Sequence, residues 1–100
     1  MLVNADDLFK KIGYNRGADE VSMIDEQPHE LIVYWKEFAF GNNKYVKDII
    51  IDTKDLTSYV TCYNIDADEL SYRYSSLNYT EQTVVCRKLQ ELLREKGEEI

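Results

Sequence analysis

The residues of this chain that could do chemistry are one histidine, two cysteines and scattered carboxylates. His29 follows Pro28 in a predicted turn, with no second histidine and no cysteine near it in the sequence. A zinc site would have to recruit Cys62, Cys86 and carboxylates from distant segments, because zinc needs several such ligands. We therefore interpret His29 as a solvated turn residue and expect no metal site.

Two segments begin like ligand-binding motifs and then depart from them. Residues 66–69 (Asp-Ala-Asp-Glu) open like a calcium loop, but Ser71 and Leu77 stand where that loop needs a glycine and a glutamate. Residues 13–17 (Gly-Tyr-Asn-Arg-Gly) lack the Gly-Lys-Ser/Thr ending of a phosphate loop. The chain also lacks a Gly-x-Ser-x-Gly elbow. We therefore expect no cofactor and no enzymatic activity.

The elements that position these residues begin with a predicted hairpin. Residues 31–38 are rich in β-branched and aromatic side chains and lead to the turn signal Gly41-Asn42-Asn43. A three-residue loop would place Glu37 opposite Lys47 on the returning strand. A two-residue loop would instead place Glu37 against Asp48, a pair of like charges. We therefore predict the three-residue loop.

A second turn, at residues 53–56, returns the chain through residues 58–63 with Ile51 opposite Ser58. Side chains alternate across each strand, so this register divides them between two faces. The predicted core face carries Leu31, Val33, Trp35, Ile49, Ile51, Val60 and Cys62. The opposite face carries Ile32, Tyr34, Lys36, Phe38, Asp48, Ile50, Tyr59, Thr61 and Tyr63. We expect Trp35 to be buried beside Ile49 and Val60.

Two more strands complete the expected sheet. Residues 21–24 form a first strand, and Pro28 marks the turn that follows it. A short edge strand is expected at residues 70–74. The sequence therefore predicts an antiparallel meander of three to five strands.

Helices are expected at both ends of the chain. Asn4 is a good N-cap for a short helix over residues 5–12, which Gly13 ends. A longer helix is predicted from an N-cap at Thr80 to about residue 96, followed by Gly97. Its core-facing stripe is predicted to comprise Val85, Cys86, Leu89, Leu92 and Leu93. The fold class is thus α+β, with the meander flanked by a short N-terminal helix and a longer C-terminal helix.

Composition limits the domain count and the partners. One hundred residues without an internal repeat predict a single domain, residues 1–100. The formal net charge of −7 makes the protein acidic, and such a surface repels phosphates, so we expect no direct binding to nucleic acid. Residues 1–7 lack the regions of a signal peptide, and no segment resembles a membrane span. We expect a cytoplasmic protein that does not bind membranes.

The cysteines agree with a cytoplasmic location. Cys62 lies on the predicted core face and Cys86 at the edge of the helical stripe. We expect both to be buried free thiols. A disulfide between them stays open, because the helix could pack on that face of the sheet.

The two ends of the chain carry a resemblance. Residues 4–14 (Asn-Ala-Asp-Asp-Leu-Phe-Lys-Lys-Ile-Gly-Tyr) resemble the start of small uncharacterised proteins encoded by prophages of Gram-positive bacteria. Residues 92–97 (Leu-Leu-Arg-Glu-Lys-Gly) are similar to the end of their last helix. The chain departs from them in a longer tyrosine-bearing segment before that helix. The resemblance implies a bacterial cytoplasm and a phage accessory role, and it carries over no site residue.

These features favour a non-enzymatic module that binds a protein partner or a second copy of itself. The predicted interface is the aromatic part of the second sheet face, because such surfaces are typical of interface cores. It comprises Ile32, Tyr34, Phe38, Ile50, Tyr59 and Tyr63. The competing interpretation is that the chain covers this face itself. An alternative function is an acidic mimic of nucleic acid that inhibits a DNA-binding enzyme.

Overall fold

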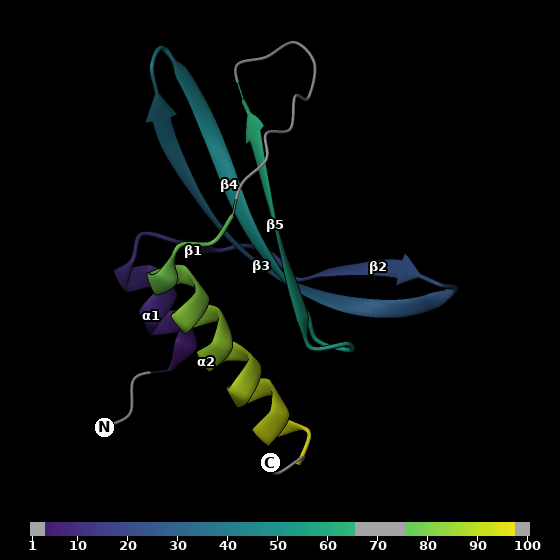
Figure 1. Cartoon of the computed structure of the whole chain (residues 1–100). Coiled ribbons are helices and arrows are strands. Elements are labelled where there is room, and N and C mark those ends of the chain that lie inside the picture. Colours follow the sequence, from purple (N-terminus) through teal and green to yellow (C-terminus); the bar gives the residue numbers. More distant parts are fainter. Residues whose placement is uncertain (1–3, 66–75, 98–100) are drawn as a thin grey trace.

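A short helix, an antiparallel sheet and a longer helix follow one another along the chain (Figure 1). The computed structural model describes residues 4–65 and 76–97. The helices are α1 (Ala5–Lys11) and α2 (Tyr79–Glu95). The strands are β1 (Asn15–Arg16), β2 (Glu20–Ile24), β3 (Gln27–Phe40), β4 (Asn43–Asp52) and β5 (Thr57–Asn64). The predicted α+β class and element order are confirmed, while the edge strand predicted at 70–74 lies outside the described residues.

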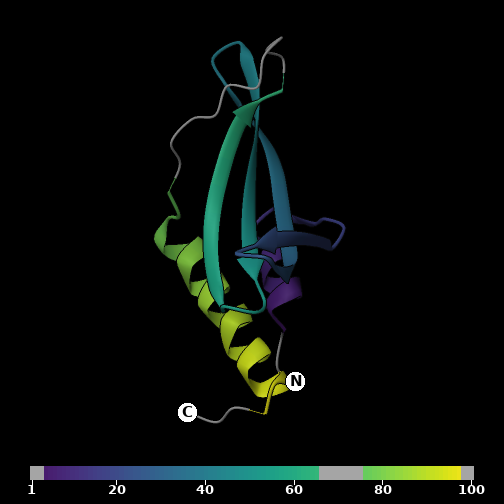
Figure 2. The ribbon, with the colours of Figure 1, turned by 90° about the vertical axis from the view of Figure 1, so that its right-hand side faces the viewer.

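The long strand β3 organises the sheet. The strand order of the sheet is β1-β3-β4-β5, and β2 pairs with β3 along the same edge as β1. Between β1 and β2 the N–H of Gly17 donates to the carbonyl of Val33 at 2.8 Å, which keeps this edge attached. The β2–β3 hairpin and the far ends of β3, β4 and β5 extend beyond both helices (Figures 1 and 2).

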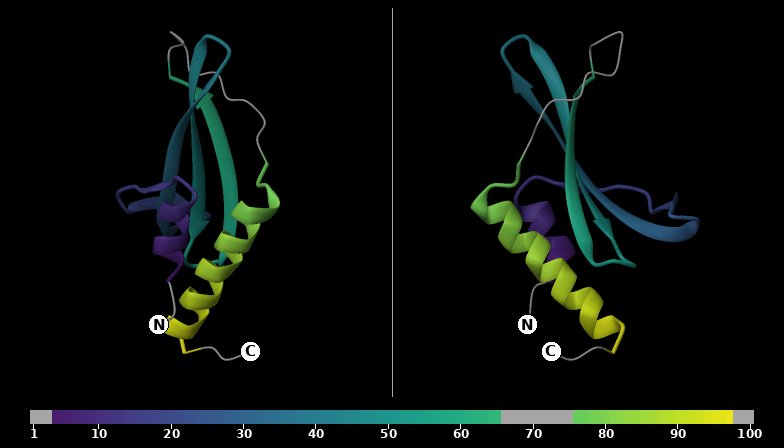
Figure 3. Two further views of the ribbon diagram at one scale, coloured as in Figure 1. Left: turned by 90° about the vertical axis from the view of Figure 1, so that its left-hand side faces the viewer. Right: turned by 45° about the vertical axis from the view of Figure 1, so that its right-hand side comes forward.

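Both helices pack on one face of the sheet (Figure 3). From α1, Phe9 stacks on Tyr34 of β3, with ring centroids 3.7 Å apart. The rest of the core joins Tyr14, two isoleucines of β4 and three apolar residues of α2. Those residues are Ile49, Ile51, Val84, Val85 and Leu92. We call this the helix-covered face and the other the open face.

Local signals set the ends of both helices. The side chain of Asn4 accepts from the N–H of Asp7 at the start of α1, and Gly13 follows with φ +96°, as predicted. The N-cap of α2 is Asn78 and not Thr80, because Asn78 and Glu81 form a reciprocal capping box. Gly97 follows α2 with φ +75°.

The predicted register of β3 against β4 is wrong by one residue. The loop consists of Gly41 and Asn42 alone, with Phe40 paired to Asn43, so Glu37 lies opposite Val46 and faces neither Lys47 nor Asp48. Gly41 has φ +63°, as a tight hairpin with glycine at its first loop position requires. Lys36 therefore lies opposite Lys47, a like-charge pair.

A buried carboxylate explains why these two lysines can face each other. Glu81 of α2 lies 2.9 Å from the Nζ of Lys47 and 3.9 Å from the Nζ of Lys36. Its negative charge offsets their mutual repulsion. The sequence pattern within the hairpin contains no trace of this partner, because Glu81 comes from the other end of the chain.

The register of β4 against β5 is confirmed. Ile51 lies opposite Ser58 and Ile49 opposite Val60. The turn before β3 differs from the prediction, because Asp25 and Glu26 form it with φ of 51° and 65°. Pro28 instead lies within β3, opposite Met23.

The one-residue shift moves Trp35 to the other face. Trp35 pairs with Asp48 on the open face, so its predicted place beside Ile49 and Val60 under the second helix is wrong. In α2 the buried stripe also differs, since Glu81 and Lys88 belong to it and Cys86 is exposed. Both cysteines are free, and Cys62 is buried as predicted.

Within the part of the chain described here, neither helix has the length and apolar character needed to cross a membrane.

Candidate functional site

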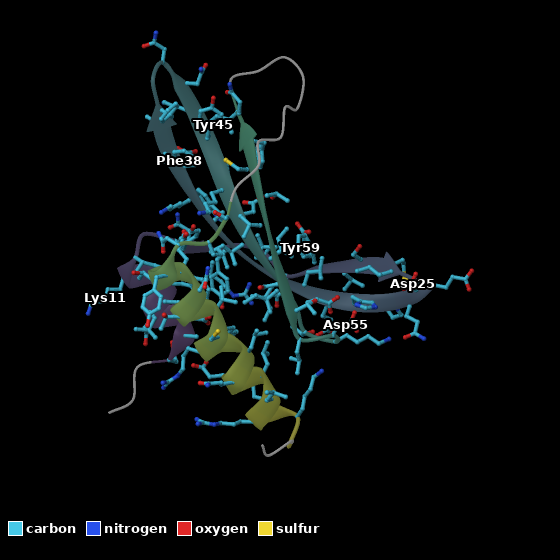
Figure 4. All side chains as sticks on the ribbon, in the orientation of Figure 1. Lys11, Asp25, Phe38, Tyr45, Asp55 and Tyr59 are labelled. Atoms are coloured by element: carbon cyan, nitrogen blue, oxygen red, sulfur yellow. The ribbon has the colours of Figure 1, made fainter. Side chains whose placement is uncertain are left out.

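The six residues of the predicted interface do not form one patch. Ile32, Tyr34 and Phe38 lie on the helix-covered face, whereas Ile50, Tyr59 and Tyr63 lie on the open face. Tyr34 is 1% exposed beneath α1 and cannot meet a partner in the folded protein. Phe38 stacks on Tyr45 beyond the helices, with ring centroids 5.6 Å apart (Figure 4). The six residues are divided because the register differs by one residue from the prediction, which places every side chain of β3 on the other face relative to β4.

A groove of about 500 Å³ crosses the open face, and we call it the open-face groove. Its walls come from the β1–β2 connection, the start of β2, the open faces of β3, β4 and β5, and the residue after β5. They comprise Gly17, Ala18, Glu20, Val33, Trp35, Glu37, Val46, Asp48, Tyr63 and Ile65. The lining includes three carboxylates and two large aromatic rings, with no lysine or arginine among these residues.

The β1–β2 connection holds one wall of the groove against the indole of Trp35. A Cβ at Gly17 would lie 3.3 Å from the carbonyl oxygen of Val33 and 3.5 Å from Cδ1 of Trp35. The absence of a side chain at Gly17 therefore lets the backbone approach the ring closely. The backbone of Gly17 thus lies beside one edge of the indole.

The electrostatics of the open face are negative. Burial raises the pKa of Asp48 above its usual value, and the charge of Glu20 acts in the same direction, against a hydrogen bond from Thr61. The pKa of Tyr59 is also raised, first by burial and then by the charges of Asp52 and Glu20. Carboxylates on different strands thus act on the same surface, which disfavours further negative charge and favours a cation.

A second cluster contains the histidine. His29 is 5% exposed within β3, so its predicted place in a solvated turn is wrong. Its Nδ1 lies 2.6 Å from Oδ2 of Asp52 and 3.8 Å from Oδ2 of Asp55. Figure 4 shows Asp55 in the turn between β4 and β5. These three side chains place one histidine nitrogen and two carboxylates within reach of a single metal ion.

The bonding of Asp52 favours a structural role for this cluster. Its Oδ1 accepts from the backbone N–H of Lys54 at 2.9 Å and of Asp55 at 3.2 Å, so it shapes the turn. Burial alone would raise the pKa of Asp52, but the hydrogen bonds from His29 and from the two backbone groups outweigh it and leave the pKa lowered. Both oxygens of Asp52 are thus engaged. We interpret His29 and Asp52 as an anchor for the β4–β5 turn.

A third cluster lies between α2 and the sheet. Glu81 is 2% exposed and accepts from the hydroxyl of Tyr14, from Nζ of Lys47 at 2.9 Å and from the N–H of Asn78 at 3.0 Å. Burial and the bond to Glu81 raise the pKa of Tyr14 far above its usual value. The hydroxyl therefore stays protonated and donates, which makes it a structural group and neither a base nor a nucleophile.

A similar bond joins α1 to the sheet. The hydroxyl of Tyr34 donates to Asp6, whose other partner is Nζ of Lys88 at 3.4 Å. Burial, followed by the bond to Asp6, raises the pKa of Tyr34. This triad connects α1, β3 and α2, and its chemistry is again that of a structural hydrogen bond.

Comparison with known proteins adds no function. No family model, no curated protein and no solved structure matches the chain.

Sequence reasoning missed most of the open-face groove. Of its lining, only Tyr63 belongs to the predicted interface. Val33 and Trp35 are predicted on the face opposite to Asp48, whereas all three line the groove, because the true hairpin register differs by one residue. Glu37 lies two residues after Trp35 and therefore on the same face of the strand, and this charge is a signal for a half-exposed ring that would have favoured the open face.

Proposed function

We propose that this chain is a non-enzymatic protein-interaction module that binds its partner through the open face of the sheet. The observation that carries the proposal is the open-face groove, with Trp35 and Tyr63 in its walls. Aromatic residues are enriched at the centres of protein interfaces, where they bury a large area with little loss of side-chain entropy.

The exposed residues around the groove support the same surface. Tyr59 is 45% exposed and Ile65 is 40% exposed, although both are large apolar side chains. Both helices pack on the opposite face, so among the described elements none covers these side chains. A partner that buried them would gain apolar contact without disturbing the core.

Matched double variants test this surface. Tyr59→Glu with Ile65→Glu places two charges on the open face. Tyr79→Glu with Phe40→Glu places the same charges at positions that are 85% and 65% exposed elsewhere. Thermal melts verify that both variants fold. Light scattering after size exclusion and capture from cell lysate then compare their association.

The two pairs are expected to differ. Association seen with the parent chain should persist in the Tyr79 and Phe40 pair and vanish in the Tyr59 and Ile65 pair, because a buried unpaired charge is costly. A parent chain that is monomeric and captures nothing contradicts the proposal. Equal behaviour of the two pairs contradicts it as well.

The β2–β3 hairpin supports a second candidate function, an acidic mimic of nucleic acid. Five exposed acidic residues lie on this hairpin or at its base, and the hairpin projects from the molecule (Figures 1 and 4). They are Asp19, Glu20, Asp25, Glu26 and Glu30. Asp19 is paired with Arg16 at 2.5 Å, while Asp25 lies at the tip. Asp66, Asp68 and Glu69 lie outside the described residues.

Charge-neutral substitution tests the second candidate. Asp25→Asn with Glu26→Gln should release a basic partner if the hairpin mimics phosphates, and added salt should release it from the parent chain. Retention of a basic partner by this variant contradicts the mimic. A phage accessory role and a cytoplasmic location stay predictions, and either function would be compatible with them.

A further inference from the structure

The open-face groove has the charge of a cation site. Glu20, Glu37 and Asp48 approach it from three different segments, and the lining carries no basic side chain. Because these carboxylates share one concave surface, a bound cation would relieve their mutual repulsion. The net charge of −7 acts in the same direction by attracting basic partners from a distance.

The remaining walls fit the shape of one kind of cation. A space of about 500 Å³ is far larger than a bare metal ion. Trp35 and Tyr63 offer ring surfaces, and Val33, Val46 and Ile65 offer apolar contact for an alkyl stem. A planar guanidinium stacks on aromatic rings and bonds carboxylates in a bidentate manner, while its methylene groups pack on apolar side chains.

We propose that the open-face groove binds an arginine side chain presented by a basic segment of a partner protein. The inference rests on the proposed function, and it names what the open face recognises. Trp35 provides the stacking surface, beside the backbone of Gly17. Asp48 and Glu37 accept hydrogen bonds from the guanidinium, and Glu20 adds to the negative potential.

Trp35 also supplies the measurement, because it is the chain's only tryptophan. Its fluorescence is titrated, at low ionic strength, with a capped glycine peptide that carries one central arginine. The matched peptides carry citrulline, which keeps the shape and loses the charge, or lysine, which keeps the charge and loses the planar fork. We expect a saturable change with the arginine peptide, affinity about tenfold lower with lysine, and no response with citrulline.

Protein variants locate the binding. Asp48→Asn and Glu37→Gln should each lower the affinity for the arginine peptide about tenfold, since each removes a charged hydrogen bond. Glu95→Gln makes the same charge change on the exposed end of α2 and should leave the affinity unchanged. Thermal melts confirm that all variants are folded.

Several results would overturn the inference. Equal binding of the citrulline peptide would show that charge is not recognised, and equal binding of the lysine peptide would show that the guanidinium is not. Unchanged affinity in Asp48→Asn and Glu37→Gln would place binding elsewhere. If Tyr59→Glu with Ile65→Glu abolishes association while the arginine peptide gives no response, the proposed function stands and the arginine site fails.

Discussion

Glu81 is the residue on which the packing of α2 depends most. Its carboxylate is 2% exposed and accepts from Tyr14 and Lys47, while it also belongs to the capping box of α2. Removing one partner from such a buried group leaves the others unpaired. A single side chain thus connects the helix start to β4 and to the segment after α1.

The Glu81→Ala change should lower the free energy of unfolding by about 3–5 kcal/mol, since Lys47 and Tyr14 would lose their buried acceptor. Glu95→Ala, at an exposed position of the same helix, should change it by less than about 0.5 kcal/mol. Urea unfolding followed by circular dichroism measures both. Equal losses in the two variants would show that Glu81 has no special place in the core.

The buried carboxyls also predict how stability depends on pH. Burial would raise the pKa values of Asp6, Asp52 and Glu81, but their hydrogen bonds outweigh it and leave all three lowered. A lowered pKa contributes stability above the unfolded value, which is lost as pH falls through the folded value. The melting temperature should therefore hold from pH 7 to about 5 and fall below about 4.

Glu81→Gln provides the control for this profile, because it removes one of the three titrating groups while nearly keeping its shape. The variant should lose less stability between about pH 5 and 3 than the parent chain does. A parent melting temperature that stays constant or rises over that interval would contradict the prediction.

The pKa of Asp48 is shifted in the opposite direction to those of Asp6, Asp52 and Glu81. Its pKa is raised, first by burial, so the carboxylate is less stable in the folded protein than in the unfolded chain. Asp48→Asn should then raise the melting temperature at pH 7, and the gain should shrink as pH falls and Asp48 in the parent chain becomes protonated. A gain in stability together with weaker binding of arginine would show a carboxylate retained for function at the expense of stability. A lower melting temperature would refute the assignment.

At the scale of elements, the two tight turns at the ends of β3 both contain residues with positive φ, but the residue types differ. Asp25 and Glu26 both have positive φ, whereas the other turn uses Gly41 at φ +63°. Nothing lies within 4 Å of a Cβ built at Gly41, so its requirement is conformational and not steric. A side chain in this region carries a backbone cost that glycine avoids.

Replacing the first turn by Asn-Gly, through Asp25→Asn and Glu26→Gly, should stabilise the protein by about 1 kcal/mol, because these residues suit positive φ. Gly41→Ala should destabilise it by a similar amount. Chemical denaturation of both variants gives the comparison. Stabilisation by Gly41→Ala, or destabilisation by the Asn-Gly turn, would contradict the turn geometry.

Elements whose signals are local could be predicted from the sequence. Asn4 and Gly13 bound α1 through bonds within one turn, and the apolar pairing of Ile49 with Val60 set the β4–β5 register. The β3–β4 register could not be predicted from charge pairs in the hairpin, because the decisive charge belongs to Glu81 on α2. The position of Trp35, and with it the open-face groove, depended on that register. The Asn78 cap was readable, since Glu81 follows it at capping-box spacing.

At the scale of the whole molecule, one face of the sheet holds the core and the other is open. The core is concentrated where α1 and α2 meet the middle of β3 and β4, around Tyr34, Ile49 and Ile51. The β2–β3 hairpin extends away from it as an edge, with Val21 67% and Met23 66% exposed. The surfaces that we propose for partners are thus attached to a core that they do not help to build.

This division predicts the order in which backbone amides exchange with solvent. Amides at Ile49 and Ile51 should exchange only through global unfolding, because Phe9 and Val85 cover this part of β4 within one core. Amides of β2 should exchange earlier, through local opening of the hairpin. Hydrogen exchange at increasing denaturant distinguishes the two, since global opening depends steeply on denaturant and local opening depends on it weakly. If the amides of β2 exchange as slowly as that of Ile49 and depend on denaturant as steeply, the hairpin belongs to the cooperative core. Any movement of this edge would then be accompanied by loss of core packing.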